Sequence, residues 1–538
     1  MEMLLNITIF LPLFAIAAVL LAKSDEAVKW TSLIATSATF FLSLPLLFGF
    51  DVANSSVPQY LTEGTGILAG MDIKYIVGLD GLSLLLFMLT TLMGPIVILS
   101  SWTSVKKSLK GYFSMLLLLQ TASLGVFAAL DLVVFYVFFE LSLIPMYFLI
   151  GIWGGSDRIR ATIKFFIYTL VGSLIMLIAL IYLGYSAGAA SGVYEFTSDW
   201  RYISGPEFTL GLVEQTYLFL AFALAFCIKV PLFPFHTWLP YAHTEAPTAG
   251  SVVLAAIMLK LGTYGLVRVC LPVFPNAFME FAPMMAILAV IGIIYGALVA
   301  MVQKDVKKLV AYSSVSHLGF VVLGIFAFNT VAVQGAIIQM INHGLSTGAL
   351  FLIVGMIYDR SHTRMIADFG GVAKKMPIFA VIFMIATLAS IGLPGLNGFI
   401  GEFLILNGSF FSELYNNKVY AVLAALGVIL AAVYMLWMYQ RVMFGPITNK
   451  ENEKLIDLNA REIGLLAPLV LFMIWIGVRP LDFTKYSEEW VEHYITTSEE
   501  KSITVLESAD IETLPDWTAK IYKLKEFQEH ENLLVDNK

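Results

Sequence analysis

Two lysines stand in apolar sequence on either side of a proline-rich break. The stretch 225–265, AFCIKVPLFPFHTWLPYAHTEAPTAGSVVLAAIMLKLGTYG, contains Lys229 and Lys260, and Pro231 and Pro234 follow Lys229. Proline cannot continue a regular helix. A buried lysine beside an interrupted membrane helix is costly and is typical of an ion pathway. The chemistry predicted for this stretch is therefore the transfer of protons or other ions.

A carboxylate is placed to control Lys229. Glu140 lies in the middle of the apolar run DLVVFYVFFELSLIPMYFLIG. An opposite charge favours the charged form of a lysine, whereas desolvation favours the neutral form. We therefore predict that Glu140 tunes the charge of Lys229. The alternative is a fixed ion pair that holds two helices together.

Three further residues extend the predicted proton relay beyond Lys260. His317 and His343 lie in apolar runs rich in Ser and Asn, and histidine can pass protons near neutral pH. Glu402 follows the Gly/Pro-rich break GLPGLNG and is predicted to be an exit or gating group. The competing interpretations are hydrogen-bonded core histidines and a carboxylate favoured by a helix start. His236 and His243 are expected to serve structure or gating.

The sequence offers no sign of a bound cofactor. No phosphate loop, dinucleotide fingerprint or cysteine cluster is present, and the histidines lack further ligands at metal-binding spacing. Electron transfer, if it is coupled to this chain, must therefore take place in another subunit.

The elements that position these residues are membrane spans. The 538 residues are 59% hydrophobic and 13% charged, whereas soluble domains carry about 25% charged residues. We predict an all-α polytopic membrane protein with about 14 transmembrane helices. The first residues, MEMLLN, lack the basic region of a signal peptide, so the first apolar run is read as a span. The predicted spans start near Leu4, Thr31, Leu82, Tyr112, Leu132, Thr162, Tyr217, Gly250, Pro283, Leu309, Val331, Pro377, Val419 and Ile463.

Basic residues are concentrated in alternate loops. By the positive-inside rule these loops are cytoplasmic, so both termini are predicted on the periplasmic side of a bacterial inner membrane. The outer loops near 51–78 and 190–213 are read as surface caps. The acidic tail from Asp482 is too charged to span, and Trp517, Ile521, Leu524 and Phe527 predict an amphipathic helix or a loosely ordered extension.

Interrupted helices 7 and 12 suggest two inverted five-helix repeats. The predicted units are N-terminal helices 1–3 (1–110), a first repeat of helices 4–8 (111–271), a second repeat of helices 9–13 (281–445), helix 14 (446–480) and the polar tail (481–538).

Five long motifs carry a family resemblance. They are FFELSLIPMYFLIGIWGG, KFFIYTLVGSLIMLIA, KVPLFPFHTWLPYAHTEAPTAGSVVLAAIMLKLGTYGL, KDVKKLVAYSSVSHLG and GLPGLNGFIGEF, and they resemble the chain M family of bacterial respiratory complex I. The mitochondrial counterpart of that family is the fourth core membrane subunit. The resemblance covers about Leu82 to Gly445. Tyr241 departs from it, because the family commonly has Asp at this position.

The resemblance implies a proton-translocating subunit of NADH–quinone oxidoreductase. It matches Glu140 to the family's span-five glutamate, Lys229 to the broken-helix lysine, Lys260 to the bridging lysine and Glu402 to the terminal acid. It implies no cofactor in this chain, with NADH, FMN, iron–sulfur clusters and quinone in the whole complex. The implied partners are the other complex I membrane subunits, especially neighbouring antiporter-like chains, together with the lipid bilayer and protons but no nucleic acid.

Two alternative functions use a similar channel. One is a subunit of a multisubunit sodium/proton antiporter, and the other is a subunit of a membrane-bound hydrogenase or ferredoxin-driven relative. Antiporter-type sisters usually place a lysine where this chain has Glu402, which favours chain M. A purely structural scaffold does not explain at least four costly charges at the membrane midplane.

Overall fold

The protein is a bundle of long apolar helices. The computed structural model describes residues 1–68, 70–415, 418–447 and 449–507. Within these residues, 12 helices are long and apolar enough to cross a membrane, and two shorter apolar helices, Leu84–Ser100 and Pro377–Ser390, lie at the remaining predicted positions. The all-α membrane fold is therefore confirmed, while the count of fourteen spans and the two inverted repeats stay predictions.

The helices and strands have the following bounds. The α-helices are α1 Glu2–Leu21, α2 Asp25–Phe48, α3 Leu84–Ser100, α4 Leu109–Ala128, α5 Leu132–Leu141, α6 Leu143–Trp153, α7 Arg158–Ser191, α8 Trp200–Ser204, α9 Leu212–Lys229, α10 Leu239–Glu245, α11 Thr248–Val253, α12 Leu259–Gly265, α13 Leu271–Val273, α14 Pro275–Met301, α15 Val306–Phe326, α16 Thr330–Ser361, α17 Pro377–Ser390, α18 Asn397–Phe410, α19 Val419–Met443, α20 Ala460–Val478 and α21 Leu481–Glu507. The strands are β1 Gln59–Leu68, β2 Met71–Leu79 and β3 Phe196–Thr197.

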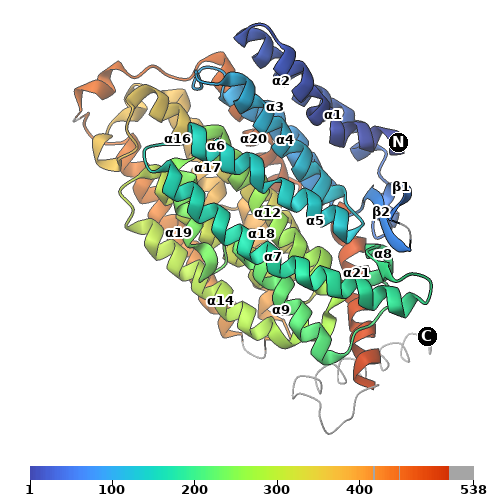
Figure 1. Ribbon diagram of the computed structural model, residues 1–538. Coiled ribbons are helices and arrows are strands. Elements are labelled where there is room, and N and C mark those ends of the chain that lie inside the picture. The colour runs from blue at the N-terminus through green and yellow to red at the C-terminus, as the bar shows by residue number, and fades with distance from the viewer. Residues whose placement is uncertain (69, 416–417, 448, 508–538) are drawn as a thin grey trace.

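One end of the bundle, here called the sheet end, carries a small sheet and a lateral helix. β1 pairs antiparallel with β2, and β2 pairs parallel with β3. The helix α21 lies at this end beside α8 (Figure 1). The sheet gives the two predicted surface caps a shared structure that the sequence did not indicate. Within the tail, α21 is an ordered helix, whereas the amphipathic segment predicted at 517–527 lies outside the described residues.

The N-terminus and α21 lie at the same end of the bundle. The Asn6 side chain near the start of α1 donates to Thr62 in β1 at 2.8 Å and accepts from Tyr75 in β2 at 2.8 Å. The Ser56 N–H and hydroxyl, beside β1, donate to Glu489 of α21 at 2.7 and 2.6 Å. An even number of crossings between Met1 and Leu481 follows from this arrangement.

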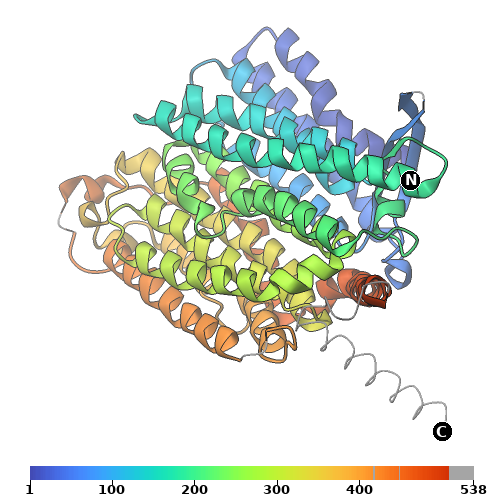
Figure 2. The ribbon, with the colours of Figure 1, turned by 60° about the horizontal axis from the view of Figure 1, so that its bottom comes forward.

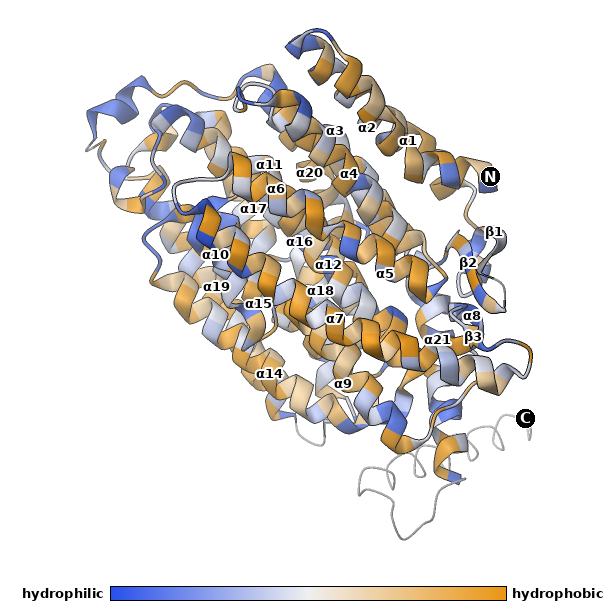
Figure 3. Ribbon diagram, in the orientation of Figure 1, coloured by the Kyte–Doolittle hydropathy of each residue, from blue (hydrophilic) through white to orange (hydrophobic). Residues whose placement is uncertain are grey.

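The opposite end, here called the basic end, gathers the basic loops. Lys106 and Lys107 of the α3–α4 loop line a common cavity with Lys307 and with Arg364 of the α16–α17 loop. Polar residues also gather at both ends of the bundle, while the long helices between them are largely apolar (Figure 3). Figure 2 shows the same helices after a turn of 60° about the horizontal axis. This distribution matches a membrane protein whose hydrocarbon belt surrounds the middle of the bundle.

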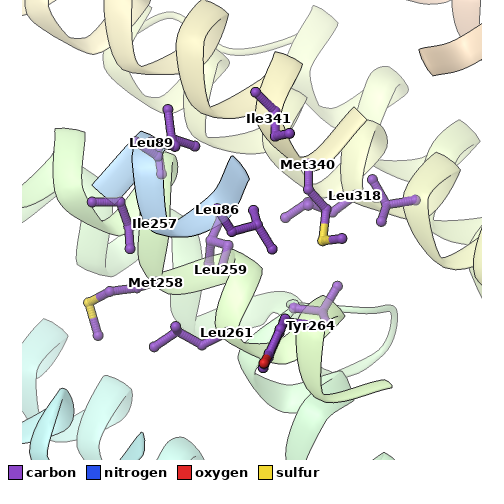
Figure 4. Packing of buried hydrophobic residues seen from close by; sticks show 14 of the residues in the cluster. Leu86, Leu89, Ile257, Met258, Leu259, Leu261, Tyr264, Leu318, Met340 and Ile341 are labelled. Carbon is purple, nitrogen blue, oxygen red and sulfur yellow. The ribbon is translucent and has the colours of Figure 1, made fainter. Parts of the chain in front are cut away.

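The helices that carry Lys260, His317 and His343 are the most enclosed. The apolar windows of α16 and of the span Thr248–Val273 are 100% buried, whereas those of α19 and α20 are 33% buried. Apolar side chains from α3, α15 and α16 pack around α12 (Figure 4). Polar residues on the enclosed helices therefore face protein rather than lipid, as membrane proteins require.

Aspartate side chains cap the N-termini of helices α5 and α15. Asp131 accepts from the N–H groups of Val133 and Val134 at 2.8 and 3.0 Å, which starts α5. Asp305 accepts from Lys307 and Lys308 at 2.7 and 3.3 Å and starts α15. Such caps satisfy backbone donors that have no partner inside the helix.

Candidate functional site

Lys260 and His343 form the centre of the site. Lys260 lies on α12 and is fully buried, and its Nζ is 2.7 Å from Nδ1 of His343 on α16. Nζ also donates to the carbonyl of Ala255. Ala255 belongs to a π-helical segment, Leu254–Met258, and a second π-helical segment, Leu266–Cys270, follows α12. π-Helical bulges are frequent at functional sites, and this one turns a backbone carbonyl toward the lysine.

His317 and Glu402 form a second buried pair. Nδ1 of His317 on α15 lies 3.0 Å from Oε1 of Glu402 on α18. Gln339 of α16 donates to the same oxygen at 3.3 Å, and the Ser390 hydroxyl is 3.3 Å from Nε2 of His317. Oε2 of Glu402 is buried and has no partner among the described residues. That oxygen can accept a proton, or a hydrogen bond from a water molecule.

The two pairs make one line. The rings of His317 and His343 are 6.1 Å apart between centroids, and Nε2 of His343 is buried without a partner in the described structure. A water between the two rings would connect them by hydrogen bonds. The structure thus brings together four predicted residues, Lys260, His343, His317 and Glu402, with His343 next to Lys260 and His317 next to Glu402.

Lys229 and Glu140 lie apart from that line. Lys229 ends α9, and its Nζ donates to the Ser142 hydroxyl at 3.2 Å and lies 4.8 Å from the Phe139 ring centroid. Within the described residues, no ion pair of 4.0 Å or less joins Lys229 to Glu140. The fixed ion pair considered for Glu140 is absent from this conformation. Ser142, which accepts from Lys229, lies at the junction between α5 and α6.

Both predicted interruptions are present. The regular helix ends at Lys229 and resumes at α10 after the 3₁₀ turn Phe235–Trp238. The second interruption separates α17 from α18. There Gly392 has φ +73°, and a Cβ on it would lie 2.7 Å from Oε2 of Glu402. Glycine is therefore needed at this break for its backbone conformation and for the space that the carboxylate occupies.

His243 connects the site with the basic end. Its two ring nitrogens are buried with no partner in the described part of the chain, and the ring stacks on Phe351 with centroids 4.4 Å apart. Its neighbours Thr244 and Glu245 line a cavity of about 720 Å³ at the basic end. An unpartnered buried imidazole is costly. Both roles expected for His243, structure and gating, therefore stay predictions.

Several polar residues of the site were not foreseen. Gln339, which was not foreseen, holds Glu402. Asn342, one of the polar residues expected around the histidines, donates to the carbonyl of Asn397 at 2.7 Å and ties α16 to the start of α18. Gln339, His343 and Thr347 recur every four residues, so they share one helix face. That spacing is a signal that could have identified Gln339. Ser142 and Ser390 gave no comparable signal.

Interrupted apolar helices, buried lysines and a histidine–carboxylate line define an antiporter-like membrane subunit. Residues 129–427 match the family model described as "NADH:quinone oxidoreductase/Mrp antiporter, TM". The chain is 47% identical to NADH-quinone oxidoreductase subunit M of Rhodobacter capsulatus over 505 residues, which cover 92% of this chain and 97% of the relative. The chain belongs to the subunit M family of NADH-quinone oxidoreductases.

The solved structures agree. A chain of respiratory complex I from Thermus thermophilus with bound NADH matches with a TM-score of 0.82 and 32% identity, covering 92% of this chain and 99% of that one. A chain of the Mrp complex from Dietzia sp. DQ12-45-1b matches with a TM-score of 0.79 and 20% identity, covering 93% and 99%. The second likeness shows a shared fold alone. The first, with the family match, favours the complex I reading over the antiporter alternative.

Proposed function

We propose that this chain translocates protons as the antiporter-like subunit M of a bacterial respiratory complex I. The observation that carries the proposal is the buried line of Lys260, His343, His317 and Glu402 across α12, α15, α16 and α18. Each member can gain or lose a proton, and the line is enclosed by protein. A purely structural role does not explain why several ionisable groups are placed end to end in the apolar interior.

Lys260 and His343 transfer a proton by exchanging the roles of hydrogen-bond donor and acceptor. Lysinium Nζ donates to a neutral Nδ1 of His343, and a neutral lysine accepts from a protonated Nδ1. His343 then reaches His317 through a water, because the two rings are not in direct hydrogen-bond contact. His317 delivers the proton to Glu402, whose second carboxylate oxygen is unpartnered.

Lys229 and Glu140 set the timing of transfer. In the conformation described, Ser142 holds Lys229, and Glu140 is not in ion-pair contact with it. Movement of Glu140 toward Lys229 would favour the lysinium, and its withdrawal would favour loss of the proton to the next group. At about 4 Å, two opposite charges interact by about 4 kcal/mol at an effective dielectric constant near 20. This energy is sufficient to change which form of Lys229 predominates.

Protons reach the line from the basic end and leave toward the sheet end. The cavity at the basic end extends to the residues that flank His243, so His243 is the uptake group nearest to water. By the positive-inside rule, the basic loops favour a cytoplasmic position for this end and a periplasmic position for both termini. Transfer of electrons from NADH through FMN and iron–sulfur clusters to quinone belongs to other subunits. The neighbouring antiporter-like chains are the membrane partners.

The test is Lys229→Met in the assembled complex. Proton pumping, measured as NADH-driven acidification of inverted membrane vesicles, should be abolished, and quinone reduction should fall with it while the complex still assembles. Lys375→Met is the matched control, because Lys375 is exposed in a loop. Normal pumping by the Lys229→Met complex would refute the proposed relay.

A further inference from the structure

We infer that the cavity at the basic end is a binding site for a phosphate-bearing anion. The cavity has a volume of about 720 Å³ and lies between the α3–α4 loop, the α6–α7 loop, the start of α11 and the end of α16. This volume is within the range of small-molecule sites in proteins. The inference goes beyond proton translocation and does not depend on the relay.

The charges around the cavity favour an anion. Four cations line it, Lys106, Lys107, Lys307 and Arg364, against the two carboxylates of Glu245 and Asp359. The surplus of positive charge faces a space bounded by protein on several sides, where electrostatic attraction is stronger than at an open surface. A phosphate group, with its one or two negative charges, matches a surplus of this sign.

The internal partners of these groups do not neutralise the surplus. Lys307 is 7% exposed, and its Nζ donates to the carbonyl of Ala246 at 2.6 Å, so this contact uses one of three N–H donors. Arg364 donates through Nη1 to the carbonyl of Thr244 at 2.7 Å. These two carbonyls are neutral, but Nε of Arg364 also lies 3.4 Å from Oδ2 of Asp305, so Asp305 offsets one positive charge and a smaller surplus remains. Glu245 accepts from the N–H of Asp157 at 2.9 Å, which occupies part of its carboxylate.

The two remaining cations are free to meet a ligand. Lys106 and Lys107 are exposed, and within the described residues no ion pair of 4.0 Å or less involves either of them. Their flexible side chains can close over an anion held by the buried Lys307 and by Arg364. Arginine and lysine together recognise phosphate oxygens through charge-assisted hydrogen bonds.

Phosphate of this kind has two sources at a cytoplasmic membrane surface. One is free phosphate or a phosphomonoester in the aqueous phase. The other is the headgroup of an anionic phospholipid, for which basic pockets at the cytoplasmic ends of helices are suited. Ile152 and Trp153 also line the cavity, and Ile152 is 45% exposed, so an apolar surface borders the charged groups. The recognition chemistry is the same for both sources.

The test is site-resolved acylation of lysines in the purified complex, followed by mass spectrometry. One arm compares inorganic phosphate with chloride at equal ionic strength in detergent. The other compares lipid nanodiscs containing phosphatidylglycerol with nanodiscs of phosphatidylcholine. At an anion concentration four times the Kd, acylation of Lys106 and Lys107 should slow about fivefold. Lys374 and Lys375, exposed in another basic loop, serve as internal controls and should not change.

Variants test the same site by affinity. Lys106→Gln should weaken the protection of Lys107 about fivefold, since each basic residue near an anionic surface contributes a factor of this size. Lys374→Gln should leave the protection unchanged. Protection in the phosphate arm assigns the site to a soluble anion, and protection only in the nanodisc arm assigns it to lipid. No protection in either arm, or equal protection of Lys374 and Lys375, would overturn the inference.

Discussion

Lys260 Nζ and His343 Nδ1 face each other at 2.7 Å in a fully buried position. At this distance a hydrogen lies between the two nitrogens, so one of them donates and the other presents a lone pair. Both groups cannot carry a proton on the facing atoms at once. The pair therefore titrates as a unit and can pass a proton without large movement of either helix.

Removing either member should interrupt the line at the same step. Lys260→Met and His343→Leu should each lower the rate of NADH-driven proton pumping by about 10²-fold or more, as expected for loss of a positioned proton-transfer group. The double variant should be no slower than the slower single variant, because residues that act as a unit are non-additive. Pumping rates in proteoliposomes check this. Fully multiplicative losses would show that the two residues work in separate routes.

The carboxylate of Glu402 should be required as a proton acceptor rather than as a hydrogen-bond acceptor alone. Glu402→Gln retains the size of the side chain and can still contact His317 and Gln339, but it cannot take up a proton. Pumping should fall about 10²-fold with little change in assembly. Glu413→Gln is the control, because Glu413 is an exposed carboxylate in the loop after α18. Wild-type pumping by the Glu402→Gln complex would remove Glu402 from the relay.

The sequence predicted those parts of the site that local patterns determine. Apolar runs located the helices, and prolines and glycines located both interruptions at Lys229 and before Glu402. Such local patterns could not predict that Lys260 and His343 face each other, because the two residues are 83 positions apart in the sequence. Ser142 was missed for the same reason, whereas the four-residue spacing between Gln339 and His343 could have identified Gln339. Their roles depend on which helix each one meets.

The sheet end was the least predictable part of the fold. The strands β1 and β2 come from a loop rich in glycine and polar residues, and their pairing is stabilised by Lys74, whose Nζ is 3.0 Å from Glu63. The acidic residues of α21 indicated a solvent-exposed segment, so the buried face of this helix was not predicted. That face includes Trp490, which donates to Asp80 at 2.9 Å. Tertiary contacts of this kind override local propensity.

Arg268 should be essential for stability at the sheet end. Its guanidinium holds the buried Asp80 through Nη2 at 2.7 Å and receives ring contacts from Trp200 and Trp490, with centroids at 4.5 and 5.6 Å. Arg268→Met leaves Asp80 buried without its counter-charge and should cost about 3–5 kcal/mol. Thermal unfolding of the complex and the amount of this chain in membranes measure the loss.

The control for Arg268 is Arg201→Met at a more exposed pair. Arg201 bonds Asp199 near the surface of the sheet end, with 30% of its side chain exposed. Exposed ion pairs contribute about 0–1 kcal/mol. A loss of stability for Arg268→Met no greater than that for Arg201→Met would contradict the assigned role of the buried pair.

The docking of α21 should strengthen as pH rises above neutrality, because Lys501 is buried there. Its Nζ donates to the carbonyls of Ile203, Ser204 and Pro272 at 3.3, 3.3 and 3.0 Å, and burial lowers the pKa of Lys501 from 10.5 to about 7. Between about pH 7 and pH 10.5, Lys501 binds more protons when α21 is undocked than when it is docked. Docking therefore gains up to about 1.4 kcal/mol per pH unit in this window. Below about pH 7 both forms are charged, and the dependence disappears.

Hydrogen exchange of the α21 amides, corrected for the intrinsic effect of pH, measures this docking. Protection should rise between pH 7 and pH 9 in the wild-type complex. It should be independent of pH in the Lys501→Met complex, where no amine is buried. Lys485→Met, at an exposed position on the same helix, should retain the wild-type dependence. An identical pH slope in the Lys501→Met complex would assign the effect to another group, since the neutral methionine cannot bind the proton that links docking to pH.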